Sequence, residues 1–147
     1  MRIVIPARYA STRLPGKPLL ALAGKPMLQH VYELACRSQA QEVVIATDDE
    51  RIAKVADSFN ARVCMTSAEH NSGTARIAEV INVMGWADDE IIVNLQGDEP
   101  LMPVSLLNQV AQDMEHHQYA DTATLAAHLE HPQQLFDPHV VKVVLDR

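Results

Sequence analysis

Short apolar runs, mostly of β-branched residues, recur along the chain and predict β-strands. They cover residues 3–5, 43–47, 62–65, 91–95, 122–127 and 140–145. The runs at 91–95 and 140–145 are nearly continuous in apolar character and do not alternate with polar residues. This pattern is typical of strands that are buried on both faces of a parallel sheet.

The stretches between these runs carry apolar residues at the i, i+3, i+4, i+7 spacing of amphipathic helices. They cover residues 28–35, 52–59, 77–84 and 107–114. Strands that alternate with helices of this length predict an α/β protein with three α/β/α layers and a mostly parallel sheet. In such folds ligands bind at the carboxyl ends of the strands.

The last residues follow the predicted strand at 140–145 directly. A strand this apolar is expected near the centre of a sheet, yet only Asp146 and Arg147 follow it. We therefore expect residues 1–147 to form a single α/β domain that is the N-terminal part of a longer protein.

Length and composition indicate one globular domain with one core. The chain has 147 residues, of which 48% are hydrophobic and 21% charged, with a net charge of −7. The apolar runs are strand-sized and no signal peptide is apparent, so we expect no membrane span and a cytoplasmic location. The isolated Cys36 and Cys64 are expected to be reduced core thiols, and the acidic balance argues against nucleic-acid binding.

Charge is distributed unevenly along the chain. The first 32 residues carry a charge of +5, so the remainder carries −12. The loop after the first predicted strand contains Arg8, Arg13 and Lys17 around the turn residues Pro15 and Gly16. Guanidinium and ammonium groups beside a turn at a strand end suit a polyphosphate, and each such bond contributes about 1.5–3 kcal/mol. A solvated basic loop that pairs with acidic residues is the simpler alternative.

Two common phosphate-binding motifs are absent from this loop. The Rossmann pattern G-x-G-x-x-G needs glycines that the loop lacks, since its first glycine is Gly16. The Walker pattern needs a Ser or Thr after Gly-Lys, whereas Pro18 follows Lys17. The loop therefore represents a different way of holding phosphate.

Two further segments carry candidate chemistry. Asp98 and Glu99 follow the predicted strand at 91–95, where a carboxylate can hold Mg²⁺ or can simply cap a turn before Pro100. Ser72 is a reasonable N-cap for the third helix, whose free amides near Gly73 can bind a polar partner.

Other polar groups have a simpler structural explanation. Asp48 and Asp49 suggest a second metal site, but Thr47 and Glu50 frame them as a capping box at a helix start. The histidines at positions 116, 117, 128, 131 and 139 lack ligand spacing, and we interpret them as surface or helix-end residues.

The loop from Pro6 to Leu19, Pro-Ala-Arg-x-x-Ser-x-Arg-Leu-Pro-Gly-Lys-Pro-Leu, resembles the signature loop of the CMP-sugar synthetases. Ser-Thr-Arg at 11–13 favours the branch that activates 3-deoxy-manno-octulosonate (Kdo), since the sialic acid branch typically has Ser-Lys-Gly there. The resemblance continues through Ala-Thr-Asp (46–48), Ser-Gly-Thr (72–74), Gln-Gly-Asp-Glu-Pro (96–100) and Val-Val-Lys-Val-Val (140–144), and so covers the whole chain.

The resemblance implies a nucleotide-diphospho-sugar transferase fold and a cytidylyltransferase that joins CTP to Kdo, giving CMP-Kdo and pyrophosphate for lipopolysaccharide biosynthesis. It implies Mg²⁺ as cofactor, held by Asp98 and by a second aspartate beyond residue 147. It also implies a homodimer at full length and little activity for residues 1–147 alone. The implied catalytic residues are Arg8, Lys17 and Asp98, and the implied substrate-binding residues are Ala7, Ser11, Arg13, Ser72, Gly73, Thr74, Arg76 and Gln96. Arg76 is expected near either the nucleotide or an acidic neighbour.

Three alternatives remain open from the sequence. The first is that the sugar is another acidic one, such as 8-amino-Kdo or a sialic acid. The second is that the chain is a nucleotide-binding module without catalysis. A phosphoryl-accepting receiver domain also alternates strands and helices, but it needs clustered acidic residues where this chain has Pro6, Ala7 and Arg8.

Overall fold

A computed structural model describes residues 1–10, 14–117 and 119–144. Its main sheet has four parallel strands in the order β5-β4-β1-β6. The strands are β1 (Arg2–Ala7), β4 (Val43–Thr47), β5 (Arg62–Met65) and β6 (Ile92–Asn94). Every residue of β4 is buried, as predicted for a strand covered on both faces.

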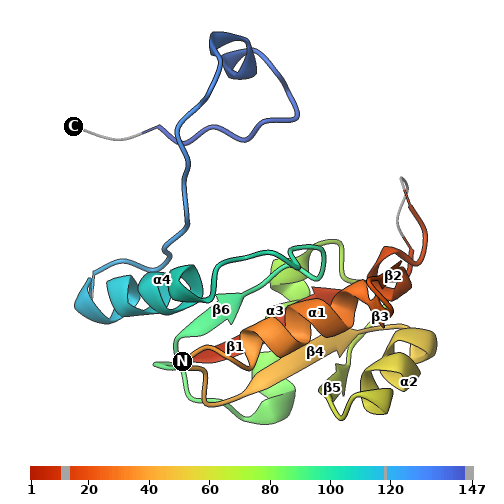
Figure 1. The fold of residues 1–147 in the computed structure, drawn as a ribbon. Coiled ribbons are helices and arrows are strands. Elements are labelled where there is room, and N and C mark those ends of the chain that lie inside the picture. Colours follow the sequence, from red (N-terminus) through yellow and green to blue (C-terminus); the bar gives the residue numbers. More distant parts are fainter. Residues whose placement is uncertain (11–13, 118, 145–147) are drawn as a thin grey trace.

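Helices cover both faces of this sheet, so the three-layer α/β/α prediction is confirmed (Figure 1). Alternate strand residues point to opposite faces: Ile3 and Ile5 pack with one group of helices, whereas Val4 packs with the other. The first group is α1 (Met27–Ala35), α2 (Glu50–Ser58) and α4 (Val104–His116), and the opposite face carries α3 (Gly73–Met84).

Short elements complete the loop after β1. A 3-10 helix, η1 (Lys17–Leu19), begins directly after Gly16, and a small antiparallel pair, β2 (Ala21–Leu22) and β3 (Lys25–Pro26), follows it. Ala23 and Gly24 both have positive φ, the conformation that a tight hairpin turn requires. These elements lead the chain from the edge of the sheet into α1.

The predicted strands at 122–127 and 140–145 are wrong for the residues that the structure describes. Residues 119–144 contain only a 3-10 helix, η2 (Pro132–Leu135), and extend away from the body of the protein (Figure 1). Val141 and Val144 are 91% and 90% exposed. A strand needs a hydrogen-bonded neighbour, and the described residues of this segment pair with none, so their β-propensity is not expressed.

The amino ends of the strands are joined by Arg2. Its guanidinium lies 2.6 Å from Glu42, which precedes β4, and 2.9 Å from Glu90, near the start of β6. The same group stacks over Trp86, with 5.0 Å between Cζ and the ring centroid. This cluster lies at the end of the sheet opposite to the candidate functional residues.

Both cysteines are free thiols, as predicted, but only Cys64 is buried. The prediction that Cys36 is a core thiol is wrong, because it follows the last turn of α1 on the exposed side. No helix of the described residues is long and apolar enough to cross a bilayer.

Candidate functional site

The predicted site residues come from elements that end or begin at one edge of the sheet. Arg8 directly follows β1, Asp98 follows β6 by a few residues, and Ser72 precedes α3. Because the strands are parallel, their carboxyl ends share this edge. Ser11 and Arg13 lie outside the described residues.

Lys17 and Asp98 are in direct contact, although 81 positions separate them in the sequence. The Lys17 ammonium donates to Asp98 Oδ2 over 2.6 Å. The two side chains are 38% and 49% exposed, so the pair faces solvent and remains accessible to a ligand. A cation and a carboxylate therefore lie side by side at the carboxyl ends of β1 and β6.

Arg8 connects the loop after β1 to the segment before α3. Its guanidinium donates to the carbonyl oxygen of His70. The His70 ring in turn lies 2.5 Å from Glu79 Oε2, and the same oxygen accepts from the Ser67 amide over 2.9 Å. The hydrogen bond from the Ser67 amide, and to a smaller extent the one from His70, lowers the pKa of Glu79. Sequence patterns gave no signal for this link.

Gly97 and Gly73 both lie close to Pro6, near the end of β1. A Cβ added at Gly97 would lie 3.1 Å from the Pro6 carbonyl oxygen, closer than ordinary packing permits. A Cβ added at Gly73 would make ordinary contact with the Pro6 ring at 3.5 Å. Gly97 therefore sets how closely the Asp98 loop approaches β1. Ala7, the last residue of β1, is buried beside this contact.

Thr74 and Gln96 line one large cavity. It has a volume of about 1110 Å³ and lies between β6, α3, α4 and residues 120–125. Gln96 is exposed and donates its amide to Asn94 Oδ1 over 3.2 Å. Ser72 is the N-cap of α3, as predicted, and its hydroxyl accepts from the Ala75 amide over 3.1 Å. The two segments implied to contact cytosine thus border the same space.

Arg76 is completely buried in the first turns of α3. It donates to the Thr66 hydroxyl, and its Nη2 lies 3.3 Å from Asp48 Oδ2. Its Nε and Nη2 atoms have no hydrogen-bond partner among the residues that the structure describes. Of the two surroundings expected for Arg76, the structure provides the acidic neighbour, which joins α3 to the carboxyl ends of β4 and β5.

Asp48 and Asp49 have separate structural roles. Asp49 is the N-cap of α2 and accepts from the Arg51 amide over 2.9 Å, so the capping box predicted for Thr47 and Glu50 is wrong. Thr47 instead accepts from the Asp49 amide. The hydrogen bonds from the Arg51 side chain lower the pKa of Asp49. The helix-start interpretation of this pair is nevertheless correct for Asp49.

Asp98 has the chemistry of a magnesium ligand. Mg²⁺ prefers hard oxygen ligands and usually keeps several waters, so one or two exposed carboxylates beside a phosphate are sufficient. The described residues contain no group of three side chains able to enclose a metal ion. Burial, reinforced by the nearby Asp98 carboxylate, raises the pKa of Glu99.

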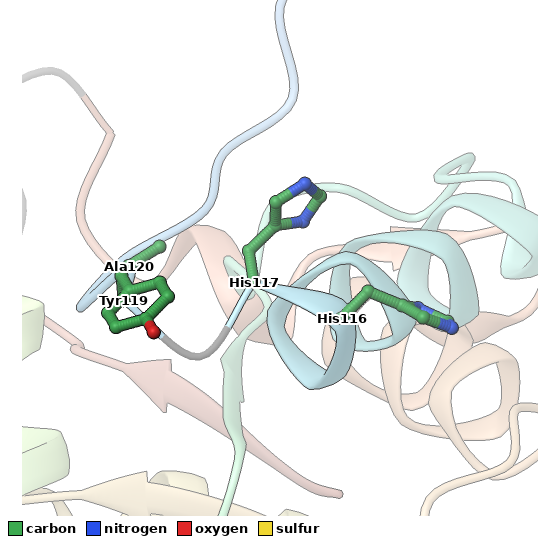
Figure 2. A pocket seen from close by; sticks show the side chains of 4 residues that line it. All are labelled: His116, His117, Tyr119 and Ala120. Atoms are coloured by element: carbon green, nitrogen blue, oxygen red, sulfur yellow. The ribbon is translucent and has the colours of Figure 1, made fainter.

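A second, smaller cavity of about 400 Å³ lies at the end of α4 (Figure 2). His116 and His117 line it, with Tyr119 and Ala120. The two imidazole rings point in different directions in Figure 2, and each bonds a backbone carbonyl four residues earlier, at 2.7 and 2.8 Å. This agrees with their interpretation as helix-end residues.

Comparison with known proteins identifies the family. The family model described as cytidylyltransferase matches residues 2–147. The chain is 61% identical over 145 residues to a 3-deoxy-manno-octulosonate cytidylyltransferase of Thioalkalivibrio sulfidiphilus and 56% identical over 146 residues to one of Coxiella burnetii. These matches cover 99% of this chain but only 58% and 59% of the relatives, so the chain spans somewhat more than half their length.

Solved structures agree with this assignment. The fold matches CMP:2-keto-3-deoxy-manno-octonic acid synthetase complexed with CTP, with a TM-score of 0.74 and 45% identity over 80% of this chain and 48% of that one. It also matches a cytidylyltransferase from Leptospira borgpetersenii, with a TM-score of 0.69 and 30% identity, over 80% of this chain and 49% of that one. The loop after β1, the fold and these relatives lead to one conclusion: the chain belongs to the cytidylyltransferase family.

Proposed function

We propose that this chain forms the nucleotide-binding part of an enzyme that transfers the cytidylyl group of CTP to Kdo. The anomeric hydroxyl oxygen of Kdo forms a bond to the α-phosphorus and loses its proton to solvent. The bond from that phosphorus to the β-phosphate oxygen breaks, and pyrophosphate leaves with the electron pair. The product, CMP-Kdo, is the activated sugar for lipopolysaccharide biosynthesis.

The observation that carries this proposal is the contact between Lys17 and Asp98 at 2.6 Å. Nucleotidyl transfer depends on positioning and on neutralising phosphate charge more than on covalent help from the protein. A lysine for the β- and γ-phosphates and a carboxylate for a metal ion are the two groups that such a site needs. The relatives named for the same reaction, and the neighbour complexed with CTP, support this assignment.

Each predicted residue has a role in this proposal. Lys17 and Arg8 hold the triphosphate, with Ser11 and Arg13 predicted to assist from the same loop. Asp98 would hold Mg²⁺, which when bound neutralises phosphate charge beside the α-phosphorus. Gln96, Ser72, Gly73 and Thr74, with the backbone at Ala7, select the cytosine. Because Arg76 is buried against Asp48, we assign it to support the Ser72–Thr74 segment and not to contact CTP.

Further properties are proposed for the full-length protein. Free Cys36 and Cys64 support a reducing compartment, and hence the cytoplasm. The second magnesium ligand, most Kdo contacts and the homodimer interface are predicted for the part of the relatives' length that this chain does not span.

Pyrophosphate release by the full-length protein tests the reaction. Each of the four nucleoside triphosphates is supplied with Mg²⁺, with and without Kdo, 8-amino-Kdo or a sialic acid. We expect release only when CTP and Kdo are present together. Release that is indifferent to the base would contradict the assignment of Gln96 and Ser72–Thr74. Tight CTP binding without release on any sugar would instead favour a regulatory nucleotide-binding module.

A further inference from the structure

Tyr9 supports Gly16 through both its backbone and its ring. The Gly16 amide donates to the Tyr9 carbonyl oxygen over 2.8 Å, which joins the two residues through their backbones. Gly16 is buried and has a φ of 70°. A Cβ added there would lie 3.1 Å from Tyr9 Cε2, so the ring lies directly against the residue that precedes Lys17. The position of Lys17 therefore depends on the position of Tyr9.

Arg51, on the first turn of α2, covers the other side of this tyrosine. Its Cζ atom lies 3.3 Å from the centroid of the Tyr9 ring, in a cation–π contact. Arg51 is distant in sequence from the loop, but α2 and η1 are in contact in the fold. The stack of Arg51 on Tyr9 therefore joins the loop after β1 to α2.

Asp49 fixes the direction of the Arg51 guanidinium. Asp49 Oδ1 accepts from Arg51 Nε over 2.9 Å, and Oδ2 accepts from Nη2 over 2.6 Å, so the ion pair is bidentate. Bidentate geometry restrains the plane of a guanidinium, and not only its charge. The same Oδ1 caps α2, so the carboxylate is itself held by the helix start.

We propose that the Asp49–Arg51–Tyr9 stack is a positioning device that holds the loop bearing Gly16 and Lys17 in the conformation that binds the triphosphate. The inference rests on the proposed function. None of the three residues needs to touch CTP. They act through Gly16, whose left-handed conformation turns the chain directly before Lys17. Arg51 is 60% exposed, so its replacement leaves the core intact.

The experiment compares Arg51→Met and Tyr9→Leu with two matched controls in the full-length protein. Lys54→Met removes a cation from the exposed side of the same helix, and Tyr9→Phe keeps the aromatic ring. CTP affinity is measured by calorimetry, and hydrogen exchange is measured at the Gly16 amide. We expect Arg51→Met and Tyr9→Leu to weaken CTP binding about two- to fivefold, the range of an exposed cation–π contact. Both should also accelerate exchange at Gly16.

One further variant separates the positioning effect of Arg51 from the effect of its charge. Arg51→Lys keeps the charge but not the planar fork, so it should restore only part of the CTP affinity. Unchanged affinity and unchanged Gly16 exchange in Arg51→Met would overturn the proposal, as would an equal loss in Lys54→Met. If the unmodified protein did not bind CTP, the proposed function would fail. The Gly16 exchange rates would still decide whether the stack orders the loop.

Discussion

The ammonium of Lys17 lies 2.6 Å from the carboxylate of Asp98, so the group proposed to bind phosphate and the group proposed to bind the metal ion neutralise each other. Binding of a metal–nucleotide complex has to exchange this contact for two others. An exposed ion pair of this kind contributes about 0.2–1 kcal/mol, so the exchange is readily reversible.

When no metal ion is present, replacing Asp98 and replacing Lys17 should change the affinity for CTP in opposite directions. Asp98→Asn releases Lys17 and removes a negative charge, so CTP binding in EDTA should tighten by up to about fivefold. Lys17→Gln removes a charged contact to phosphate, so CTP binding should weaken by about tenfold or more. Calorimetric titration with CTP measures both effects.

Glu33→Gln is the matched control for this pair, because it breaks a similarly exposed ion pair of 2.7 Å with Lys25. CTP affinity should not change in this variant. A weaker metal-free affinity in Asp98→Asn would contradict the competition between Asp98 and phosphate for Lys17. With Mg²⁺ present, we expect Asp98→Asn to lose at least tenfold in pyrophosphate release.

Gly97→Ala should destabilise the protein, because the new methyl group would lie 3.1 Å from the Pro6 carbonyl oxygen. Overpacking against backbone typically costs about 1–3 kcal/mol. Gly73→Ala is the control, since its methyl group would make ordinary contact with the Pro6 ring and favours a helix start. Its free energy of unfolding should be unchanged or raised by up to about 1 kcal/mol. Urea unfolding of both variants measures this, and equal stabilities would argue against a close approach at Gly97.

Arg76→Met should lower the free energy of unfolding by about 3 kcal/mol. Breaking a buried pair costs about 3–5 kcal/mol, and the lower end applies because the Asp48 side chain is 20% exposed. Arg37→Met, at an exposed position after α1, should change the stability little. Thermal and urea unfolding provide the comparison. A fully stable Arg76→Met protein would mean that burying the two Arg76 nitrogens that lack a hydrogen bond from the described residues costs as much as the ion pair contributes.

Acid should loosen the segment before α3. The pKa of Glu79 is lowered in the folded protein by the Ser67 amide and by His70, so the unfolded state binds the proton first as pH falls. The stability from this carboxylate is therefore complete above its unfolded pKa of about 4.5 and is lost as pH falls below it. The difference in stability between the unmodified protein and Glu79→Gln should shrink between pH 6 and pH 3. A difference that stays constant over this range would refute the assignment.

The periodicity of apolar residues correctly predicted the helices and strands that make up the parallel sheet and its two covering layers. All four predicted helices and the four strands that form the parallel sheet are present, with ends displaced by a few residues. The runs at 122–127 and 140–145 have equal β-propensity, but a strand also requires an edge with which to pair. Cys36 shows the same limit, since its apolar neighbours do not determine which side of α1 it lies on.

Motif reasoning singled out Lys17 and Asp98, which the structure brings into contact, but it did not predict the contacts that surround them. Arg8 was expected beside phosphate, and its bond to the His70 carbonyl depends on how a loop after β5 returns to β1. Arg51 carries no motif, and only the contact between α2 and η1 brings it over Tyr9. Local sequence encodes the type of side chain, whereas such contacts depend on the tertiary path of the chain.

The cluster formed by Arg2, Glu42, Glu90 and Trp86 is separated from the candidate site by the length of the strands. Strengthening the Arg2 cluster should therefore raise the free energy of unfolding without disturbing the proposed nucleotide site. An engineer who wants a hardier protein can redesign the Arg2 end without touching the residues proposed to contact the nucleotide.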